Sequence, residues 1–462
     1  MKQIIYLLFI SALFLNRPSV ADKAATPLTI QEAAGLTSWI KFSVTQRTRY
    51  ETFDSTFKNN RTGGDQVAAF RTQAQLEAAY RQFKFGAEFI DSRIALDDAG
   101  TTVDTTMVNE AELLQAYLAW QTDDFLGSGL EAEIKFGRHT MDLGSRRLVA
   151  RNRFRNTINN FNGINFLVQA QDHWQWRNFV VLPVSRLPND PQSLRDGIVD
   201  FDEENFNVIF AGSFFSIAQL PFDSRGELYF FHLSEDDTAN TPSKNRRLST
   251  PGLRWFRDPK PERFDFELET ALQTGTSHAG SAAATVKLDH FAYFGHAAFG
   301  YTFHFPGTPR LVLQYDYASG DGDPNDGHNG RFETLYGARR FEYGPTGSWG
   351  AFARANINTP GIRVQFTPMP NLTGFVAHRA FWLAEKRDAW TGAGLRDQTG
   401  QSGSYIGQQL EASLKWNAIP NLVALETGWA HLFKGQFAKN APGSPDNKSD
   451  SDYFYAQTTV SF

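Results

Sequence analysis

A period-two alternation of apolar and polar residues is the feature that most restricts the fold of this 462-residue chain. Between residues 82 and 89 the apolar positions are Phe83, Phe85, Ala87 and Phe89. The same pattern recurs in residues 130–136, 264–273, 311–317 and 409–416. Because successive side chains of a β-strand point to opposite faces, each segment has one apolar and one polar face. Helical periodicity of comparable length is missing, so the sequence predicts an all-β protein.

The length of the alternating segments separates a membrane barrel from a soluble β-sandwich or solenoid. They run for about 9 to 14 residues, which suits a transmembrane strand, whereas soluble strands typically have about five or six residues. A barrel alternates lipid-facing and lumen-facing residues, so its average stays polar while its aromatic content is high. The mean hydropathy of −0.40 and the 41 Phe residues fit this class. We expect a transmembrane antiparallel β-barrel in the Gram-negative outer membrane, surrounded by lipid and lipopolysaccharide.

The N-terminus has the layout of a secretory signal peptide. Lys2 precedes the apolar run of residues 4–15, and the small residues Ser19 and Ala21 follow it. The alternative is a membrane anchor, but the run of about 12 residues is shorter than the roughly 20 that a spanning helix needs. We predict a signal peptide over residues 1–21 and a single barrel domain over residues 22–462. The chain contains no cysteine, so it has neither disulfides nor the acylated cysteine of a lipoprotein.

Connections of alternating length predict the orientation of the barrel, because outer-membrane barrels join short periplasmic turns to long extracellular loops. From residue 305 onward, short turns at residues 305–309, 368–371 and 417–421 alternate with long polar stretches. This alternation requires residues 349–366 to form one strand, with a bulge at Pro360-Gly361 where the apolar parity changes. Counted in this way, the sequence predicts about 18 strands.

The last segment predicts how the barrel is assembled. Residues 454–462 alternate strictly and end on Phe462. A terminal phenylalanine at the end of such a strand resembles the assembly signal of outer-membrane proteins. The barrel assembly machinery is therefore an expected partner.

Arginines on the polar faces of the strands are the candidate functional residues, because a barrel of 16 to 18 strands is wide enough for an aqueous channel. Ile40, Phe42, Val44 and Tyr50 define the lipid face of the first strand. By the same parity on this and later strands, the side chains predicted to face the lumen are Lys41, Arg47, Arg49, Arg71, Arg354, Arg363 and Arg379. A denser group, Arg138, Arg146, Arg147, Arg151, Arg153 and Arg155, lies where glycines and asparagines break the strand pattern. We expect part of this group to fold inward as a loop and narrow the pore.

The guanidinium group suits an anion pathway, because it stays charged and binds carboxylates with two parallel hydrogen bonds. A series of such sites lets an anion pass from one to the next, which predicts a carboxylated permeant and an anion-selective pore. The alternative is that these arginines only pair with lumen acids such as Glu77, Glu131, Glu267 and Asp316.

Other kinds of site find little support in the sequence. The net charge of −5 and the lack of basic tracts argue against nucleic acid as a partner. Nucleophile-elbow, zinc-protease and nucleotide-binding motifs are absent, so we expect no enzyme, no cofactor and no metal. His290, His296 and His304 share strand parity, but about 20 Å of strand separates the first two, so they cannot bind one ion. Residues 321–327 resemble a calcium loop with the glycine displaced and no closing glutamate, which favours a plain turn.

Several motifs resemble the alginate export proteins and related porins. They are Lys135-Phe136-Gly137-Arg138, Asp142-Leu143-Gly144, Arg147-Leu148-Val149, Asn156-Thr157, Phe161-Asn162-Gly163, Tyr317-Ala318-Ser319-Gly320-Asp321, Arg379-Ala380-Phe381-Trp382-Leu383-Ala384, Arg387-Asp388-Ala389-Trp390 and Asp452-Tyr453-Phe454-Tyr455. The resemblance spans nearly the whole mature chain. It implies a monomeric 18-stranded barrel whose arginine-rich constriction passes an anionic polysaccharide, with Arg138, Arg147 and Arg379 as pore residues.

Two functions follow from these observations. The first is an outer-membrane channel for anionic saccharides or organic acids, such as alginate-like polyuronates and oligouronates. The second is a barrel that serves as an adhesin or an outer-membrane enzyme and presents its long loops. Conductance distinguishes them, because an adhesin or an enzyme should conduct little.

Overall fold

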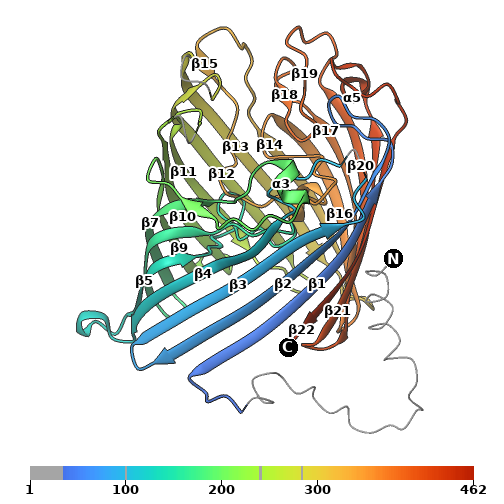
Figure 1. Cartoon of the computed structure of the whole chain (residues 1–462). Coiled ribbons are helices and arrows are strands. Elements are labelled where there is room, and N and C mark those ends of the chain that lie inside the picture. Colours follow the sequence, from blue (N-terminus) through green and yellow to red (C-terminus); the bar gives the residue numbers. More distant parts are fainter. Residues whose placement is uncertain (1–34, 99–100, 239–241, 282–284) are drawn as a thin grey trace.

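The computed structural model describes residues 35–98, 101–238, 242–281 and 285–462, and the predicted signal peptide lies outside them. The chain forms a closed antiparallel β-barrel of 18 strands (Figure 1). The barrel strands are β1 Ile40–Phe53, β2 Asp65–Tyr80, β3 Phe83–Ala95, β4 Asn109–Thr122, β5 Glu131–His139, β6 Phe161–Ala170, β7 Trp174–Ser185, β9 Val208–Leu220, β10 Ser224–Glu235, β11 Arg247–Arg257, β12 Phe264–His278, β13 Lys287–Thr302, β14 Arg310–Ala318, β16 Ile357–Met369, β17 Leu372–Trp382, β20 Tyr405–Ile419, β21 Val423–Lys434 and β22 Ser451–Ser461. The predicted fold class and strand number are confirmed.

Each strand pairs with the next along the chain, and the last pairs with the first. The closing pair of β22 and β1 runs from Thr45 opposite Ser461 to Phe53 opposite Tyr453. The connections at one rim are short, as at residues 81–82, 171–173 and 370–371, whereas those at the other rim are long. In the described part of the chain, no helix has the length and apolar character needed to cross a membrane.

Short elements lie in the long connections. They are α3 Pro191–Arg195, β8 Glu203–Glu204, β15 His328–Asn329, α4 Arg340–Tyr343, β18 Ala389–Trp390, β19 Leu395–Arg396 and α5 Gln436–Asn440, while the 3₁₀ turn η2 Phe125–Gly127 lies at the opposite rim. Figure 1 shows β15, β18, β19 and α5 at the top of the molecule and the C-terminal residue lower down.

The alternation in the sequence corresponds to the two faces of the wall. On β3, Phe83, Phe85 and Phe89 are exposed on the outside, whereas Glu88 is buried on the lumen side. The opposing partners follow the same rule, since exposed Leu118 on β4 lies opposite Phe85. The outer face is thus an apolar band for lipid, and the polar face encloses the lumen.

The prediction of one bulged strand over residues 349–366 is wrong in two respects. Strand β16 begins at Ile357, and the eight preceding residues belong to the loop inside the barrel, where Trp349 and Phe352 are fully buried. Pro360 and Gly361 keep a regular register with β14, and the irregularity in β16 lies between Phe366 and Met369. The apolar residues before Ile357 alternate because they pack into the interior of the loops, not because they face lipid.

Two long connections fold into the lumen and contact each other there. They join β5 to β6 (residues 140–160, loop A) and β14 to β16 (residues 319–356, loop B, which contains α4). Val149 of loop A forms a parallel bridge with Tyr336 of loop B, and the amide of Ala338 donates to the carbonyl oxygen of Arg146 at 2.9 Å. The inward folding predicted for the arginine-rich segment is confirmed for loop A. Loop B is the partner that the sequence did not reveal.

Candidate functional site: the arginine-lined lumen

Arginines from the first two strands fasten loop A to the wall. Arg47 donates to the carbonyl oxygens of Arg153 at 2.9 Å, Phe154 at 3.1 Å and Arg155 at 3.0 Å. Arg71 donates to the carbonyl oxygens of Arg153 at 3.1 Å and Arg155 at 2.9 Å. Both side chains are buried. The ligands of these two guanidinium groups in loop A are peptide carbonyl oxygens and not a carboxylate.

Arg49 links loop A to loop B. Its Nε donates to Glu51 Oε1 at 2.7 Å, and its Nη1 donates to the carbonyl oxygen of Phe154 at 2.6 Å. Glu51 in turn accepts from the backbone N–H of Ser348 in loop B at 2.7 Å. This arginine therefore has a carboxylate partner and forms part of the framework.

Arg147 is the centre of a buried ion-pair network. Its Nη1 lies 2.5 Å from carboxylate oxygens of both Glu267 and Glu269 on β12, and its Nε binds Glu342 of α4. Arg354 of loop B binds the other oxygen of Glu342. Burial acts to raise the pKa of Glu342, but the two guanidinium groups hold it below the usual value. Glu342 is therefore ionised at neutral pH and joins the two loops.

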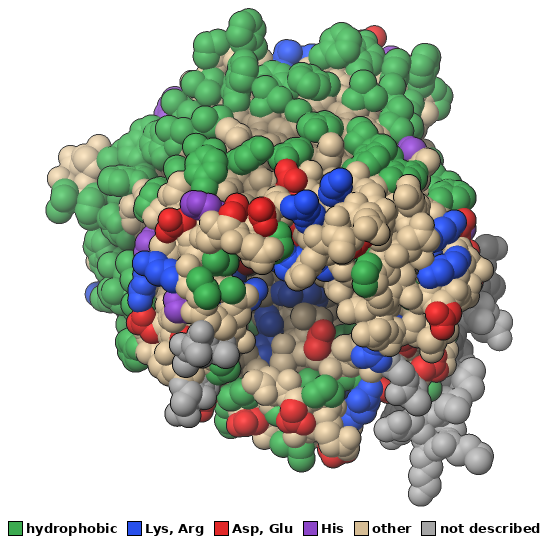
Figure 2. All heavy atoms as spheres, turned by 90° about the horizontal axis from the view of Figure 1, so that it is seen from above, with side chains coloured by type: hydrophobic (Ala, Val, Ile, Leu, Met, Phe, Trp, Pro, Cys, Tyr) green, Lys and Arg blue, Asp and Glu red, His purple; other side chains and the backbone are tan. Residues whose placement is uncertain are grey.

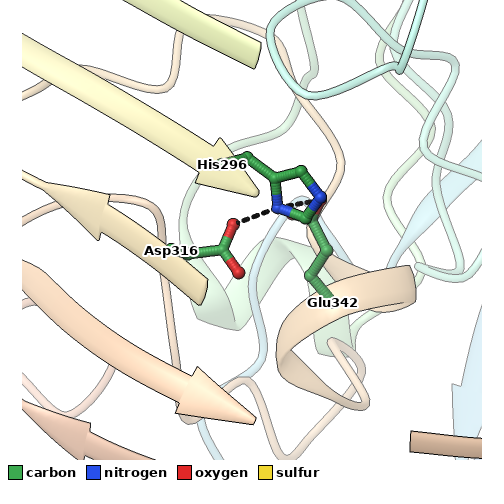
Figure 3. A group of neighbouring side chains, drawn as sticks. All are labelled: His296, Asp316 and Glu342. Carbon is green, nitrogen blue, oxygen red and sulfur yellow. Dashed lines mark hydrogen bonds and ion pairs between the residues drawn. The ribbon is translucent and has the colours of Figure 1, made fainter. Parts of the chain in front are cut away.

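A second ion pair continues the network along the same wall, from β12 to the nearby strands β13, β14 and β17. Arg379 on β17 binds Asp316 Oδ2, and His296 Nδ1 on β13 lies 2.7 Å from Asp316 Oδ1. His296, Asp316 and Glu342 are all buried and face one another (Figure 3). Arg147 and Arg379 thus lie inside the barrel as predicted, but both have carboxylate partners. These two arginines therefore pair with acids of the lumen, as the alternative interpretation of the sequence holds.

The three residues of Figure 3 could hold a metal ion by spacing alone, because one ligand atom from each lies within 4.8 Å of the others. The chemistry of this donor set argues against one. Arg147, Arg354 and Arg379 already occupy oxygens of the two carboxylates. A cation here would have to displace guanidinium groups from a buried and already compensated site. We interpret the group as part of the ion-pair network.

Arg363 on β16 is the buried lumen arginine with the most unused hydrogen-bonding capacity. Its Nη1 donates to the carbonyl oxygen of Phe341 at 2.7 Å, and its guanidinium lies 4.7 Å from the centre of the Phe375 ring. Within the described residues, no carboxylate lies within ion-pair distance, and both Nε and Nη2 are buried without an acceptor. These two nitrogens form the side of the guanidinium that binds a carboxylate with two hydrogen bonds.

Arg363 lines two cavities in the lumen, of about 650 and 260 Å³. Three arginines line the larger cavity: Arg310, Arg340 and Arg363. Arg310 binds Asp265, with Nε to Oδ2 at 2.9 Å, and Arg340 lies 2.5 Å from Glu411. Phe154, Phe341 and Phe375 supply aromatic surface to the same cavity. Arg363 is therefore the one of these three arginines that has no carboxylate.

Two loop arginines, Arg155 and Arg339, also have no carboxylate at ion-pair distance among the described residues. Burial and neighbouring arginines lower the pKa of Arg155 to about 9 and that of Arg339 to about 10. Both values lie above neutral pH, so both groups stay charged. Figure 2 shows Lys and Arg side chains at the bottom of the hollow that opens toward the long-loop rim.

The remaining predicted site residues lie elsewhere. Arg138 shares strand parity with exposed Phe136 and binds Glu112 and Glu204 rather than the lumen network. Arg138 was expected in the pore, but its side chain lies on the outer side of the wall. Arg153 belongs to loop A but is largely exposed and pairs with Asp142. Arg354 faces the interior from loop B and not from a strand.

Sequence reasoning missed Glu342 and Arg340 of α4, which bind Arg147 and Glu411. No strand parity applies to residues of an inward loop. A usable signal was the density of charged and aromatic residues at 339–343, which resembles that of loop A.

The turn at residues 321–327 is held by its own hydrogen bonds. Asp323 Oδ1 accepts from the amide of Asn325 at 3.2 Å, and Asp326 Oδ1 accepts from that of His328 at 2.8 Å. Asp321 lies 3.7 Å from Arg396. These contacts agree with the interpretation as a plain turn.

Comparison with known proteins supports the reading of the fold. The family described as alginate export matches residues 38–451. Pseudomonas aeruginosa OpdK with vanillate is similar in structure, with a TM-score of 0.57, 11% sequence identity and coverage of 92% of this chain and 98% of that one. OccK3 (OpdO) of the same organism has a TM-score of 0.53, 15% identity and coverage of 94% and 98%. OpdQ has a TM-score of 0.53, 13% identity and coverage of 92% and 97%. Among curated protein sequences, none matches the chain.

Proposed function

Since this chain belongs to the alginate export family, we propose that its barrel passes carboxylated solutes through the arginine-lined lumen. It is an outer-membrane channel of Gram-negative type by family and fold. The solute class that we propose is a uronate or another organic acid, either as a monomer or as part of an alginate-like polyuronate.

The observation that carries this proposal is the unpaired edge of Arg363. Two buried donors without an acceptor are unfavourable, because each has lost its water without gaining a partner. A solute carboxylate supplies two acceptor oxygens at the spacing of Nε and Nη2. Arg363 also lines both lumen cavities, so a solute in either of them lies near its side chain.

The electrostatic field of the lumen supports the same solute class. The ion-pair network around Arg147 is compensated, whereas Arg47, Arg71, Arg155, Arg339 and Arg363 have no carboxylate at ion-pair distance among the described residues. Uncompensated cations inside a low-dielectric wall attract anions even when the net charge of the chain is −5.

The larger cavity supports a ring-sized solute. Its volume of about 650 Å³ lies within the usual range of small-molecule sites. Phe154, Phe341 and Phe375 can contact the apolar face of a sugar or an aromatic ring. Vanillate, which the OpdK structure contains, is an aromatic carboxylate, and alginate is a chain of carboxylated sugar rings.

Reversal potentials in a planar bilayer under a salt gradient test the proposal. We expect the wild-type channel to prefer anions and Arg363→Ala to lower this preference, most strongly at low salt, where the Debye length grows to about 30 Å. Arg363→Lys should keep the anion preference and weaken block by galacturonate, because lysine keeps the charge but cannot form two parallel hydrogen bonds to a carboxylate. Arg93→Ala is a matched control. Arg93 is 51% exposed and follows Ser92, whose hydroxyl faces loop A, so its own side chain faces outward.

Two results would contradict the proposal. A cation-selective wild-type channel would remove the basis for an anion pathway. A folded protein with little conductance would favour the adhesin or enzyme alternative. Equal effects of the Arg363 and Arg93 substitutions would show that total charge governs selectivity and that Arg363 has no particular role.

A further inference from the structure

The connection between β7 and β9 crosses the outside of the barrel wall. We call residues 190–206 the outer strap; they contain α3 and β8. At one end, Glu204 lies 2.9 Å from Arg138 and accepts from Asn162 Nδ2 at 2.7 Å. Arg138 and Asn162 oppose each other across β5 and β6, on the face that carries exposed Phe136 and Ile164. The strap therefore lies over the lipid-facing side at this point.

The other end of the strap is anchored near the upper ends of β3 and β4. Leu194 of α3 is buried with Val103 and Val108, and Arg195 Nη2 donates to the carbonyl oxygen of Thr101 at 2.6 Å. In between, Asp202 is buried and accepts from Asn109 Nδ2 at 2.8 Å. The strap is thus a fixed element of the wall with attachments at both ends and in the middle.

The free side of the strap is strongly apolar. Ile198, Val199, Phe201 and Phe206 are exposed, the two phenylalanines by 65% and 81%. Four large apolar side chains on one segment of 9 residues exceed the scattered exposure that a water-facing loop normally shows. The apolar band of the barrel continues directly beneath them, with Leu113, Phe136, Ile164 and Val180 exposed on β4 to β7.

The height of the strap agrees with this continuity. In Figure 1, α3 lies well below the top loops that carry β15, β18 and β19. β5 and β6 have only 9 and 10 residues, because the connection between them folds into the lumen. The strap therefore covers the wall where these two strands end early.

We propose that the outer strap inserts Ile198, Val199, Phe201 and Phe206 into the acyl region of the outer leaflet and anchors this side of the barrel at the interface. The occupant of the surface is lipid acyl chain, because the patch extends the lipid-facing band. The exposed carboxylates Asp196, Asp200 and Glu203 alternate with the apolar side chains and remain at headgroup level. An apolar side toward lipid and a charged side toward water is the pattern of an interfacial segment.

The absence of cysteine from the chain makes a direct test possible, because any introduced cysteine can be labelled alone. Phe201→Cys and Phe206→Cys would each be labelled with an NBD fluorophore in the full-length protein and reconstituted into phospholipid vesicles. Phe136→Cys on the lipid-facing wall and Lys448→Cys on an exposed long loop are the matched controls. Heat-modifiable migration would establish that each variant is folded.

We expect the two strap positions to behave like position 136. Their emission should be shifted to the blue and quenched by nitroxide on the acyl chains, with little quenching by iodide in the water. Quenching by iodide to the extent seen at position 448 would overturn the proposal. Protection from both quenchers that depends on protein density would overturn it in favour of a second copy of the chain as the occupant.

Discussion

Arginine has two different roles inside this barrel, and the neighbouring carboxylates decide between them. Arg147 faces Glu267, Glu269 and Glu342 and is 3% exposed, so its charge is fully used within the protein. Arg363 has no such neighbour and keeps two free donors. The first kind holds the loops in place, whereas the second kind is the one that we propose to bind the solute.

Replacement of Arg147 by methionine should destabilise the folded barrel strongly. The side chain is similar in length, but two buried carboxylates and the partly exposed Glu267 lose their common partner, and breaking a buried pair costs about 3–5 kcal/mol. Arg153→Met, in the same loop, is the control, because Arg153 is 57% exposed and pairs with Asp142 at the surface. That change should cost about 1 kcal/mol or less. Urea unfolding in micelles, followed by tryptophan fluorescence, measures both, and equal losses would contradict the assigned roles.

Strand parity predicted the direction of arginine side chains within the strands, but not in the loops. Arg47, Arg49, Arg71, Arg363 and Arg379 lie inside the barrel because alternation is a local property of the backbone. Their partners could not be predicted in this way. Glu342 reaches Arg147, 195 positions away in the sequence, only because two loops meet in the lumen.

At the scale of elements, long alternating segments predicted the strands well, and the inward loops were the source of error. Residues before Ile357 are apolar because they fill the interior beside Trp349 and Phe352, which are fully buried. A pattern of apolar residues indicates that a surface is removed from water. It does not distinguish lipid from a packed lumen.

The short helix α4 should limit the width of the passage. Phe341 on α4 lines both lumen cavities and lies 5.2 Å from the guanidinium of Arg146. Phe341→Ala removes the ring that lines both cavities and so widens the space where they meet. We therefore expect single-channel conductance to rise above the spread of wild-type channels. Phe305→Ala, at an exposed position of a short turn, should leave conductance unchanged. An unaltered conductance in Phe341→Ala would place the narrowest point elsewhere.

At the scale of the whole molecule, the barrel depends on one closing pair of strands. The amide of Phe462 donates to the carbonyl oxygen of Val44 at 2.8 Å, and its own carbonyl accepts from Val44 at 3.2 Å. The C-terminal residue thus extends the seam between β22 and β1. Closure satisfies the backbone groups of both edge strands, which a bilayer would otherwise leave without partners.

Deletion of Phe462 should leave the chain exported but poorly inserted. The change removes two hydrogen bonds of the seam and the terminal aromatic residue that we expect the assembly machinery to recognise. Phe454→Ala tests another exposed phenylalanine, one that lies within β22, and should insert normally. Heat-modifiable protein in outer-membrane fractions is the measurement. Wild-type amounts without Phe462 would refute this role.

The contacts of loop A also set an order in time. Its carbonyl groups are held by Arg47 and Arg71 near the start of the chain, and its partner loop B follows β14, far along the chain. Contacts between such distant segments form late, because the intervening chain must first be ordered. We therefore expect loop A to be fastened to β1 and β2 first and loop B to reach it later, so that the lumen narrows in two steps.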